Sequence, residues 1–516
     1  MFKKIVIILM LGITFTASAQ TMPIDYQFGE KFNDRHRYSN LLTLDKDQNG
    51  DYILIRAYFQ GLVLRPKGYL IERYDKNLNL IEEYNYKLRD MEFVNGFVAD
   101  GRLHLLFFNY NTKKGAYEYW VHHSKTTEFE FSKTRILSIP SKAVKGAYGK
   151  NYYNRNFSNS FTTTLFFDKA KNGFLISTHL TSGKISKHML HLFDTNFNLN
   201  WEYDFSQEAE DKNYAFEHLI LSEDLSNAYL LGKAYFKKKR FKAEERKFQY
   251  EMVMVDSTRA ITQNFTTPGK YPDALYPIKI GSKLKCVGFY ADRKDNRYNG
   301  LSYYELNPND LSIEKEKYNP FSYEFMFDKF GREGDEVVKN LVFKSVDITD
   351  ENEILFNAEE YFVTSSIQRT GTGQRIKVDR FHHNDIVSVK LDAEGNMVWA
   401  RNINKLEVTQ GDDAYASYSA YTNKGITYFF ICTATEQPQQ VSEERLIFRQ
   451  GLGRSRNIFM IALDQNGKMT YEKIIDSKEA RLPFMVSKPL IDDLEDQLLF
   501  YAKRGTKKQL VQIGLN

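Results

Sequence analysis

Residues 387–399 read VSVKLDAEGNMVW: a short apolar run, an aspartate, a tight Gly-Asn turn and a second run that carries an aromatic residue. Near-copies of this pattern recur as LIERYDKNLNL at 70–80, LHLFDTNFNLNW at 190–201 and MIALDQNGKMTY at 460–471. Such self-similarity indicates a repeat architecture, and a β-hairpin as the repeated unit is typical of a β-propeller. We therefore predict an all-β fold, a single closed β-propeller of four-stranded antiparallel blades.

The hairpin pattern divides the chain into seven complete units, at 37–87, 92–137, 162–205, 216–266, 275–317, 340–403 and 414–475. Residues 482–515 then supply three more strands, which would leave unpaired backbone groups at one edge. The alternating segment 24–29 (IDYQFG) is the natural fourth strand. We predict eight blades, the last completed by this N-terminal strand. A seven-bladed ring with an appended hairpin is the alternative.

The first nineteen residues have the features of a secretory signal peptide. Lys3 and Lys4 precede an apolar core at 5–16, and Ala-Ser-Ala at 17–19 is a small-residue cleavage site. We therefore expect one propeller domain over residues 20–516, exported from the cytoplasm. No cysteine stands directly after the apolar core, and no later segment has the roughly 18 apolar residues of a membrane helix, so we expect no lipid anchor and no membrane span.

Two cysteines, Cys286 and Cys432, occur in the chain, and both lie within apolar strands. The repeat places these strands in blades that are not neighbours, beyond the reach of a disulfide. We expect two buried free thiols.

Propeller topology places the turns within hairpins on one face and the links between hairpins on the other. The links at 236–249, 291–300, 364–384 and 434–456 together hold 18 basic and 8 acidic residues, whereas the formal net charge of the whole chain is only +5. This asymmetry favours an anionic partner at the basic face, although solvated hairpins that keep the protein soluble are the simpler interpretation. The candidate binding residues are Lys237, Lys238, Lys239, Arg240, Arg375, Arg380, His382 and His383.

The link at 138–161 differs because it mixes aromatic side chains with amides and cations. Aromatic rings in such a setting stack on sugars or anchor a protein partner, although a loop that packs its own aromatics on the ring would look the same. This link contributes Tyr148, Tyr152, Tyr153 and Arg155 as candidate binding residues.

Specific chemistry is hard to find in this sequence. Asp45, Asp47 and Asn49 match the opening of a calcium loop, but its twelfth position is Arg56 instead of a bidentate acid, so an acidic hairpin turn is favoured over a structural calcium site. No nucleophile elbow or phosphate-binding loop occurs. The sequence nominates no catalytic residue and no other cofactor.

The repeated hairpin pattern and the Lys/Asn/Tyr/Phe-rich composition resemble those of exported propellers common in Bacteroidota envelopes, many of them uncharacterised. The resemblance implies a fold and export but no activity. Type IX secretion cargo in those bacteria is expected to carry a C-terminal sorting domain, and here the last strand ends at Leu515. We therefore expect the periplasm in preference to the extracellular space.

Our favoured hypothesis is a non-enzymatic propeller that docks an envelope protein on its basic, aromatic-bearing face, as an accessory subunit of an outer-membrane assembly. The alternative is a glycan-binding module, or a polysaccharide hydrolase or lyase that acts at the central channel. The enzyme would need carboxylates, histidine and tyrosine at one channel mouth. We expect no nucleic-acid partner.

Overall fold

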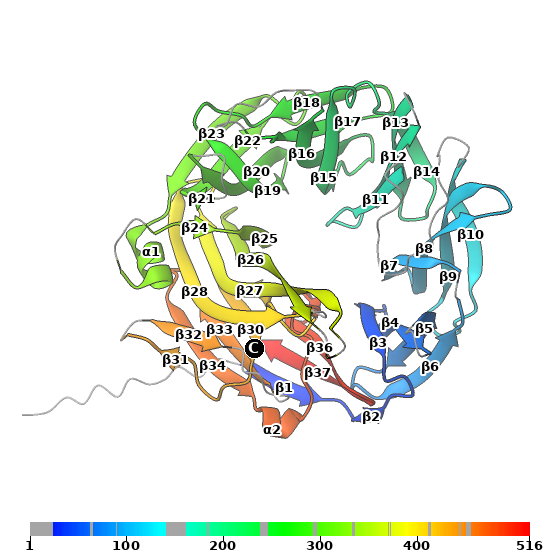
Figure 1. Cartoon of the computed structure of the whole chain (residues 1–516), viewed down its shortest axis with the longest axis vertical. Coiled ribbons are helices and arrows are strands. Elements are labelled where there is room, and N and C mark those ends of the chain that lie inside the picture. The colour runs from blue at the N-terminus through cyan, green and yellow to red at the C-terminus, as the bar shows by residue number, and fades with distance from the viewer. Residues whose placement is uncertain are drawn as a thin grey trace, which may run out of the picture.

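The computed structural model describes residues 24–61, 65–88, 90–140, 161–182, 185–237, 246–292, 297–332, 336–369, 371, 373–410, 414–442, 445–449 and 456–515. The chain is built almost entirely from β-strands, in antiparallel sheets that follow one another around a ring (Figure 1). Each sheet runs from an inner strand near the middle of the ring to an outer strand at its edge. This is the β-propeller fold that the repeated hairpin predicts.

The sheets of the N-terminal half each contain four consecutive strands. They are β3 (Ser39–Lys46), β4 (Tyr52–Gln60), β5 (Arg65–Tyr74) and β6 (Leu80–Tyr86); β7 (Glu92–Ala99), β8 (Arg102–Asn111), β9 (Ala116–Lys125) and β10 (Ser132–Pro140); β11 (Phe161–Phe167), β12 (Gly173–Ser182), β13 (Ile185–Asp194) and β14 (Leu199–Asp204); and β15 (Lys212–Leu221), β16 (Ala228–Phe236), β17 (Phe248–Val255) and β18 (Ala260–Asn264).

The C-terminal half repeats this plan with additions. Its strands are β19 (Tyr271–Ile280), β20 (Lys283–Ala291), β22 (Gly300–Leu306) and β23 (Ile313–Pro320); β25 (Leu341–Ile348), β26 (Ile354–Arg369), β27 (Arg375–Leu391) and β28 (Met397–Thr409); β29 (Ser419–Asn423), β30 (Ile426–Thr433), β33 (Asn457–Leu463) and β34 (Met469–Ile475); and β35 (Leu490–Asp492), β36 (Gln497–Arg504) and β37 (Lys507–Leu515). The boundaries of the seven predicted units agree with these sheets to within about six residues, whereas the last sheet begins at Leu490 and not at the predicted residue 482.

The predicted pairing of the two ends of the chain is confirmed. β1 (Ile24–Phe28) lies antiparallel to β37, with Ile24 opposite Leu515 and Phe28 opposite Val511. The short β2 (Phe32–Asn33) pairs with the other end of β37. The N-terminal strand thus covers the edge that three C-terminal strands would leave open.

The basic links are more regular than expected. The predicted link at 364–384 is largely strand, because β26 and β27 run on past their sheet as a long hairpin. The link at 434–456 contributes β31 (Gln439–Gln440) and β32 (Leu446–Arg449), and β32 pairs in parallel with β28 of the neighbouring sheet. The sequence pattern could not show either feature, because each depends on pairing outside the repeated hairpin.

A longer connection follows β23. It holds α1 (Tyr323–Phe330), capped by the Ser322 hydroxyl at its start, and β24 (Val338–Lys339), which pairs with β21 (Arg297–Tyr298). A single helical turn, α2 (Ser477–Ala480), precedes the last sheet. Within the described ranges, no helix is long and apolar enough to cross a membrane.

The repeated aspartates close their hairpins by a shared set of hydrogen bonds. Each accepts the backbone N–H four residues later at Oδ1, over 2.7–2.8 Å, as Asn396 donates to Asp392. The residue before that donor has a positive φ, which glycine supplies at positions 395 and 467. The local sequence pattern therefore encodes the turn directly.

The aromatic residue of the pattern joins one sheet to the next. Trp399 Nε1 donates to the Gln465 carbonyl over 3.0 Å, and Trp201 Nε1 donates to the Leu225 carbonyl over 2.9 Å. Each acceptor lies in a turn of the following sheet, so the outer strand of one sheet is tied to its neighbour. These two turns therefore help to join neighbouring sheets.

Both cysteines are buried and free, as predicted. Burial raises the pKa of Cys432 to about 12 and raises that of Cys286 as well, so both remain thiols at neutral pH.

A buried charge network lies where the first and last sheets meet. Arg56 on β4 forms ion pairs with Asp34 and with Glu72. From the last sheet, Lys508 Nζ reaches Glu72 over 2.9 Å, and Lys503 forms an ion pair with Asp34. All five residues are buried. We call them the closure network.

We predict that Glu72→Gln destabilises the protein by about 3 to 5 kcal/mol, because Arg56 and Lys508 would lose a shared buried counter-ion. Chemical denaturation measures the effect. Glu82→Gln is the matched control, because Glu82 lies on the next strand, is partly exposed and approaches Arg73 only to 3.8 Å. Equal stability of the two variants would contradict this role for the network.

The closure network should also be sensitive to acid. Burial acts to raise the pKa of Glu72 and of Asp34, but neighbouring cations outweigh it and leave both values lowered. A lowered carboxyl pKa contributes stability above its ordinary value near pH 4, and that stability is lost as the pH falls through the folded-state value. The stability difference between wild type and Glu72→Gln should therefore shrink below about pH 4. A difference that is independent of pH would refute the assignment.

Candidate functional site

A polar cavity of about 360 Å³ opens where the sheets of β15, β19 and β25 adjoin. Five of its lining residues are the rim cluster: Glu217 on β15, Lys233 on β16, Tyr250 on β17, Asp273 on β19 and Tyr298 on β21. Lys233 and Tyr250 flank the basic link at 236–249, so the cavity lies toward the predicted basic face.

Irregular strand pairing places the two carboxylates. The pairing of β15 with β16 shifts around Glu217, and the pairing of β19 with β20 shifts just after Asp273. Such bulges re-aim side chains and are frequent beside functional sites. Ala274, in the second bulge, has a φ of 48°, which is uncommon for a residue other than glycine.

Glycines on the partner strands make room for both bulges. A Cβ atom at Gly232 would come within 2.4 Å of the Ala215 carbonyl oxygen, and one at Gly288 would come within 2.8 Å of the carbonyl oxygens of Asp273 and Ala274. Any side chain at these positions would force the backbones apart. The two glycines therefore support the shape of the site.

Tyr250 lies at the centre of the rim cluster. Its hydroxyl donates to Glu217 over 2.9 Å, lies 3.4 Å from Asp273 and accepts the Ala274 N–H over 3.1 Å. Lys233 Nζ lies 3.2 Å from Glu217 and 3.5 Å from Asp273. One hydroxyl and one ammonium thus hold both carboxylates together.

The protonation states of the cluster follow from burial and charge. Burial, with Asp273 and Glu217 nearby, raises the pKa of Tyr250 well above its ordinary value. Burial acts to lower the pKa of Lys233, but the same two carboxylates outweigh it and leave the value raised. The neighbouring His218 has a pKa lowered to about 4, first by burial and then by Lys233. Near neutral pH, Tyr250 keeps its proton, Lys233 is charged and His218 is neutral.

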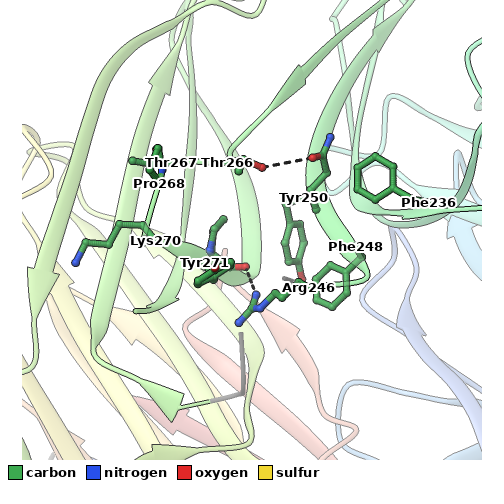
Figure 2. A pocket seen from close by; sticks show the side chains of 12 residues that line it. Phe236, Arg246, Phe248, Tyr250, Thr266, Thr267, Pro268, Lys270 and Tyr271 are labelled. Carbon is green, nitrogen blue, oxygen red and sulfur yellow. Dashed lines mark hydrogen bonds between the residues drawn. The ribbon is translucent and has the colours of Figure 1, made fainter. Parts of the chain in front are cut away.

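A second hollow, of about 200 Å³, shares Tyr250 with the polar cavity. Figure 2 shows its aromatic side chains, among them Phe236, Phe248 and Tyr271. Arg246 lies between two of these rings, 5.5 Å from the centre of Phe248 and 5.4 Å from that of Tyr271. Its guanidinium donates to the Pro272 carbonyl over 2.8 Å, beside Asp273. We call this the aromatic hollow.

The two hollows together offer flat apolar rings next to fixed carboxylate, hydroxyl and ammonium groups. Such a combination suits a ligand with apolar faces and many hydroxyl groups. Within the described ranges, no three His, Cys, Asp or Glu side chains are grouped as a metal site would require.

The candidate residues of the third basic link lie on the long hairpin that β26 and β27 form beyond their sheet, which we call the extended hairpin. His382 stacks on Phe362 at 4.3 Å and shares a hydrogen bond with Thr364, whereas His383 is buried against Glu359. Arg380 donates to Ser366 over 3.1 Å, and Arg375 is exposed at the start of β27. The structure does not bring these side chains into the rim cluster.

The remaining predicted residues fall into two groups. Lys237 donates to the carbonyls of Ala209 and Glu210, whereas Lys238, Lys239, Arg240, Tyr148, Tyr152, Tyr153 and Arg155 lie outside the described residues. Asp47 accepts the N–H groups of Asn49 and Asp51 and so stabilises the hairpin turn, whereas Asp45 accepts the N–H of Val98 on β7 and joins the first sheet to the next. Calcium binding there stays a prediction.

Sequence reasoning missed the rim cluster, because its members come from five strands spread over some eighty residues. A usable signal existed in Gly232 and Gly288, which interrupt apolar strands. A glycine inside a strand marks a bulge or a close backbone approach. That signal locates the site but does not identify its carboxylates.

No protein-family model and no curated protein matches the chain. Solved structures that it resembles include a polysaccharide lyase, with 11% identity, a TM-score of 0.38 and coverage of 92% of this chain and 90% of that chain. The β-propeller domain of the trilobed protease from Pyrococcus furiosus has 10% identity, a TM-score of 0.31 and coverage of 73% and 97%. Prolyl oligopeptidase B from Galerina marginata has 8% identity, a TM-score of 0.37 and coverage of 92% and 56%. None of these likenesses identifies an activity for this chain.

We predict that Lys233→Gln raises the pKa of His218 from about 4, because a neighbouring positive charge is removed. The value should stay below the ordinary value of about 6.5, since burial is the larger cause. Histidine-selective NMR titration measures the change. Lys279→Gln, an exposed change on β19, should leave it unaltered. An unchanged value in Lys233→Gln would show that the two side chains are not neighbours in solution.

Proposed function

We propose that the protein is an exported carbohydrate-binding propeller whose ligand lies across the aromatic hollow and the rim cluster. The observation that carries this proposal is the shared wall at Tyr250, where aromatic rings on one side meet two ordered carboxylates on the other. Sugar rings present apolar faces for stacking and hydroxyl groups for hydrogen bonds, so both halves of the site would be used.

Binding without turnover fits the protonation states better than catalysis does. A general acid or base works best with a pKa near the operating pH. The pKa of Tyr250 is well above this range, that of Lys233 is raised and that of His218 is about 4. These groups act as fixed donors and acceptors near neutrality. The carboxylates Glu217 and Asp273 are the residues to test for any cleavage.

The wider architecture is part of the same proposal. Each of the sheets that begin with β3, β7, β11, β15, β19, β25, β29 and β35 would be one blade, which makes a closed eight-bladed ring with β1 as the last strand. We further propose that residues 1–19 direct export to the periplasm. Mass spectrometry of the mature N-terminus would test that step.

Docking of an envelope protein on the basic face is the second candidate function. The extended hairpin favours it, because large apolar side chains stand exposed there: Ile367 is 72% exposed, Val363 46% and Ile376 41%. Exposed apolar groups on a projecting element are typical of interaction sites.

Glycan-array screening of the purified protein, followed by calorimetry with the oligosaccharides that bind, tests the carbohydrate proposal. We expect Tyr250→Phe and Tyr271→Ala each to weaken binding about tenfold or more, because each removes a contact at the shared wall. Tyr323→Ala on α1, a tyrosine that is 57% exposed and far along the chain, is the control and should bind as wild type.

Two outcomes would contradict the proposal. One is the absence of any bound glycan, and the other is a bound glycan that neither Tyr250→Phe nor Tyr271→Ala affects. Release of new reducing ends from a bound glycan, abolished by Glu217→Gln or Asp273→Asn, would replace binding with catalysis at the same site.

A further inference from the structure

A different cavity, of about 410 Å³, lies at the base of the extended hairpin. Its walls come from α1, β24, the base of the hairpin, β28 and β32. Figure 1 shows α1 beside β28, outside the ring of inner strands. Phe330, Phe362, Leu406 and Ile447 make much of its lining apolar. We call it the hairpin cavity.

The two carboxylates that line the hairpin cavity share one buried ammonium. Lys329, which is buried, places its ammonium 2.6 Å from Glu360 and 2.6 Å from Asp385. Asp385 also accepts the side-chain amide of Asn402 and the backbone N–H of Lys405. One ammonium facing two carboxylates leaves this part of the wall with a net charge of −1, which is smaller than the charge of the three further cations that line the cavity, Lys339, Arg445 and Arg449.

Three other cations of the same cavity, Lys339, Arg445 and Arg449, have no ion pair with a described residue. Arg445 donates to the Lys329 carbonyl over 2.7 Å and to the Asn404 side-chain oxygen over 3.3 Å, and both acceptors are neutral. Lys339 and Arg449 are exposed, and neither has a carboxylate within 4.0 Å among the described residues. Three cations thus border a partly apolar cavity without a carboxylate partner among the residues that the structure describes.

A free strand edge begins beside this cavity. β25 pairs with β26 only as far as Glu360, opposite Leu341, and the next N–H, that of Tyr361, donates to the Asn340 carbonyl. In the described part of the chain, no strand pairs with that side of β26 from Phe362 to Arg369. An uncovered edge of this kind is a template for an added strand.

We propose that the hairpin cavity binds an extended segment of a partner protein in which carboxylates stand beside large apolar side chains. The carboxylates would meet Lys339, Arg445 and Arg449, and the apolar side chains would fill the space between Phe362 and Leu406. The free edge of β26 favours a peptide over a glycan, because a peptide backbone can add to it as a strand. The cavity has the size of a typical ligand site. This site is separate from the rim cluster.

An array of short synthetic peptides of varied sequence, probed with the purified full-length protein, tests this inference. We expect the bound peptides to be enriched in Asp or Glu next to Leu, Ile or Phe. In fluorescence anisotropy, the double variant Lys339→Glu/Arg449→Glu should bind such a peptide about tenfold more weakly or worse, and added salt should weaken wild-type binding. Replacing the acids of the peptide with Gln should have a similar effect.

Two controls separate the outcomes. Lys468→Glu reverses an exposed charge in a turn on the opposite face and should leave peptide binding unchanged. Tyr250→Phe should leave peptide binding unchanged too, because the rim cluster is separate from the hairpin cavity. The carbohydrate proposal and the peptide proposal can therefore fail independently. The inference is overturned if no acidic, apolar peptide binds or if the double variant binds as wild type. Displacement of a bound peptide by polygalacturonate with equal dependence on Lys339 and Arg449 would assign the cavity to an acidic glycan instead.

Discussion

The meeting of the two ends of the chain is the constraint on which the rest of the ring depends. Backbone pairing of β1 with β37 removes an open edge, and the closure network fixes how the first sheet approaches the last. Buried charges are costly unless they are paired, so Arg56 and Lys508 tolerate only arrangements that bring Glu72 and Asp34 to them. Arg56 is also the residue that breaks the calcium-loop pattern. The departure from that motif is thus explained by the junction between the sheets.

The sequence predicts the fold well because its signals are local. An aspartate such as Asp392 bonds to the backbone four residues later, so one short pattern both forms and marks a hairpin. Counting these hairpins left three strands without a fourth, and the need to cover an edge identified β1. The additions that escaped prediction are non-local. The pairing of β32 with β28 joins the link of one sheet to the sheet before it, and no repeat in the sequence encodes that contact.

The candidate site was beyond sequence reasoning for a related physical reason. Glu217 and Asp273 sit at strand bulges, where the alternation that assigns side chains to faces breaks down. A prediction from alternation therefore misplaces the residues that a bulge re-aims. Gly232 and Gly288 were visible in the sequence, but they show only that two backbones approach closely. The partner of each carboxylate, Tyr250 above all, comes from another strand and becomes evident only in three dimensions.

The excess of basic residues in the four links also has a different meaning once the contacts are known. Lys237 donates to backbone carbonyls, Arg380 to a serine hydroxyl, and Lys377 pairs with Asp379. These three cations are therefore engaged within the chain. In the described part of the chain, Lys339 and Arg449 border a cavity without a carboxylate within 4.0 Å, so under the peptide proposal they would supply the selectivity. A broad positive field raises the association rate of an anionic partner, whereas cations without a counter-ion beside apolar walls contribute to specificity.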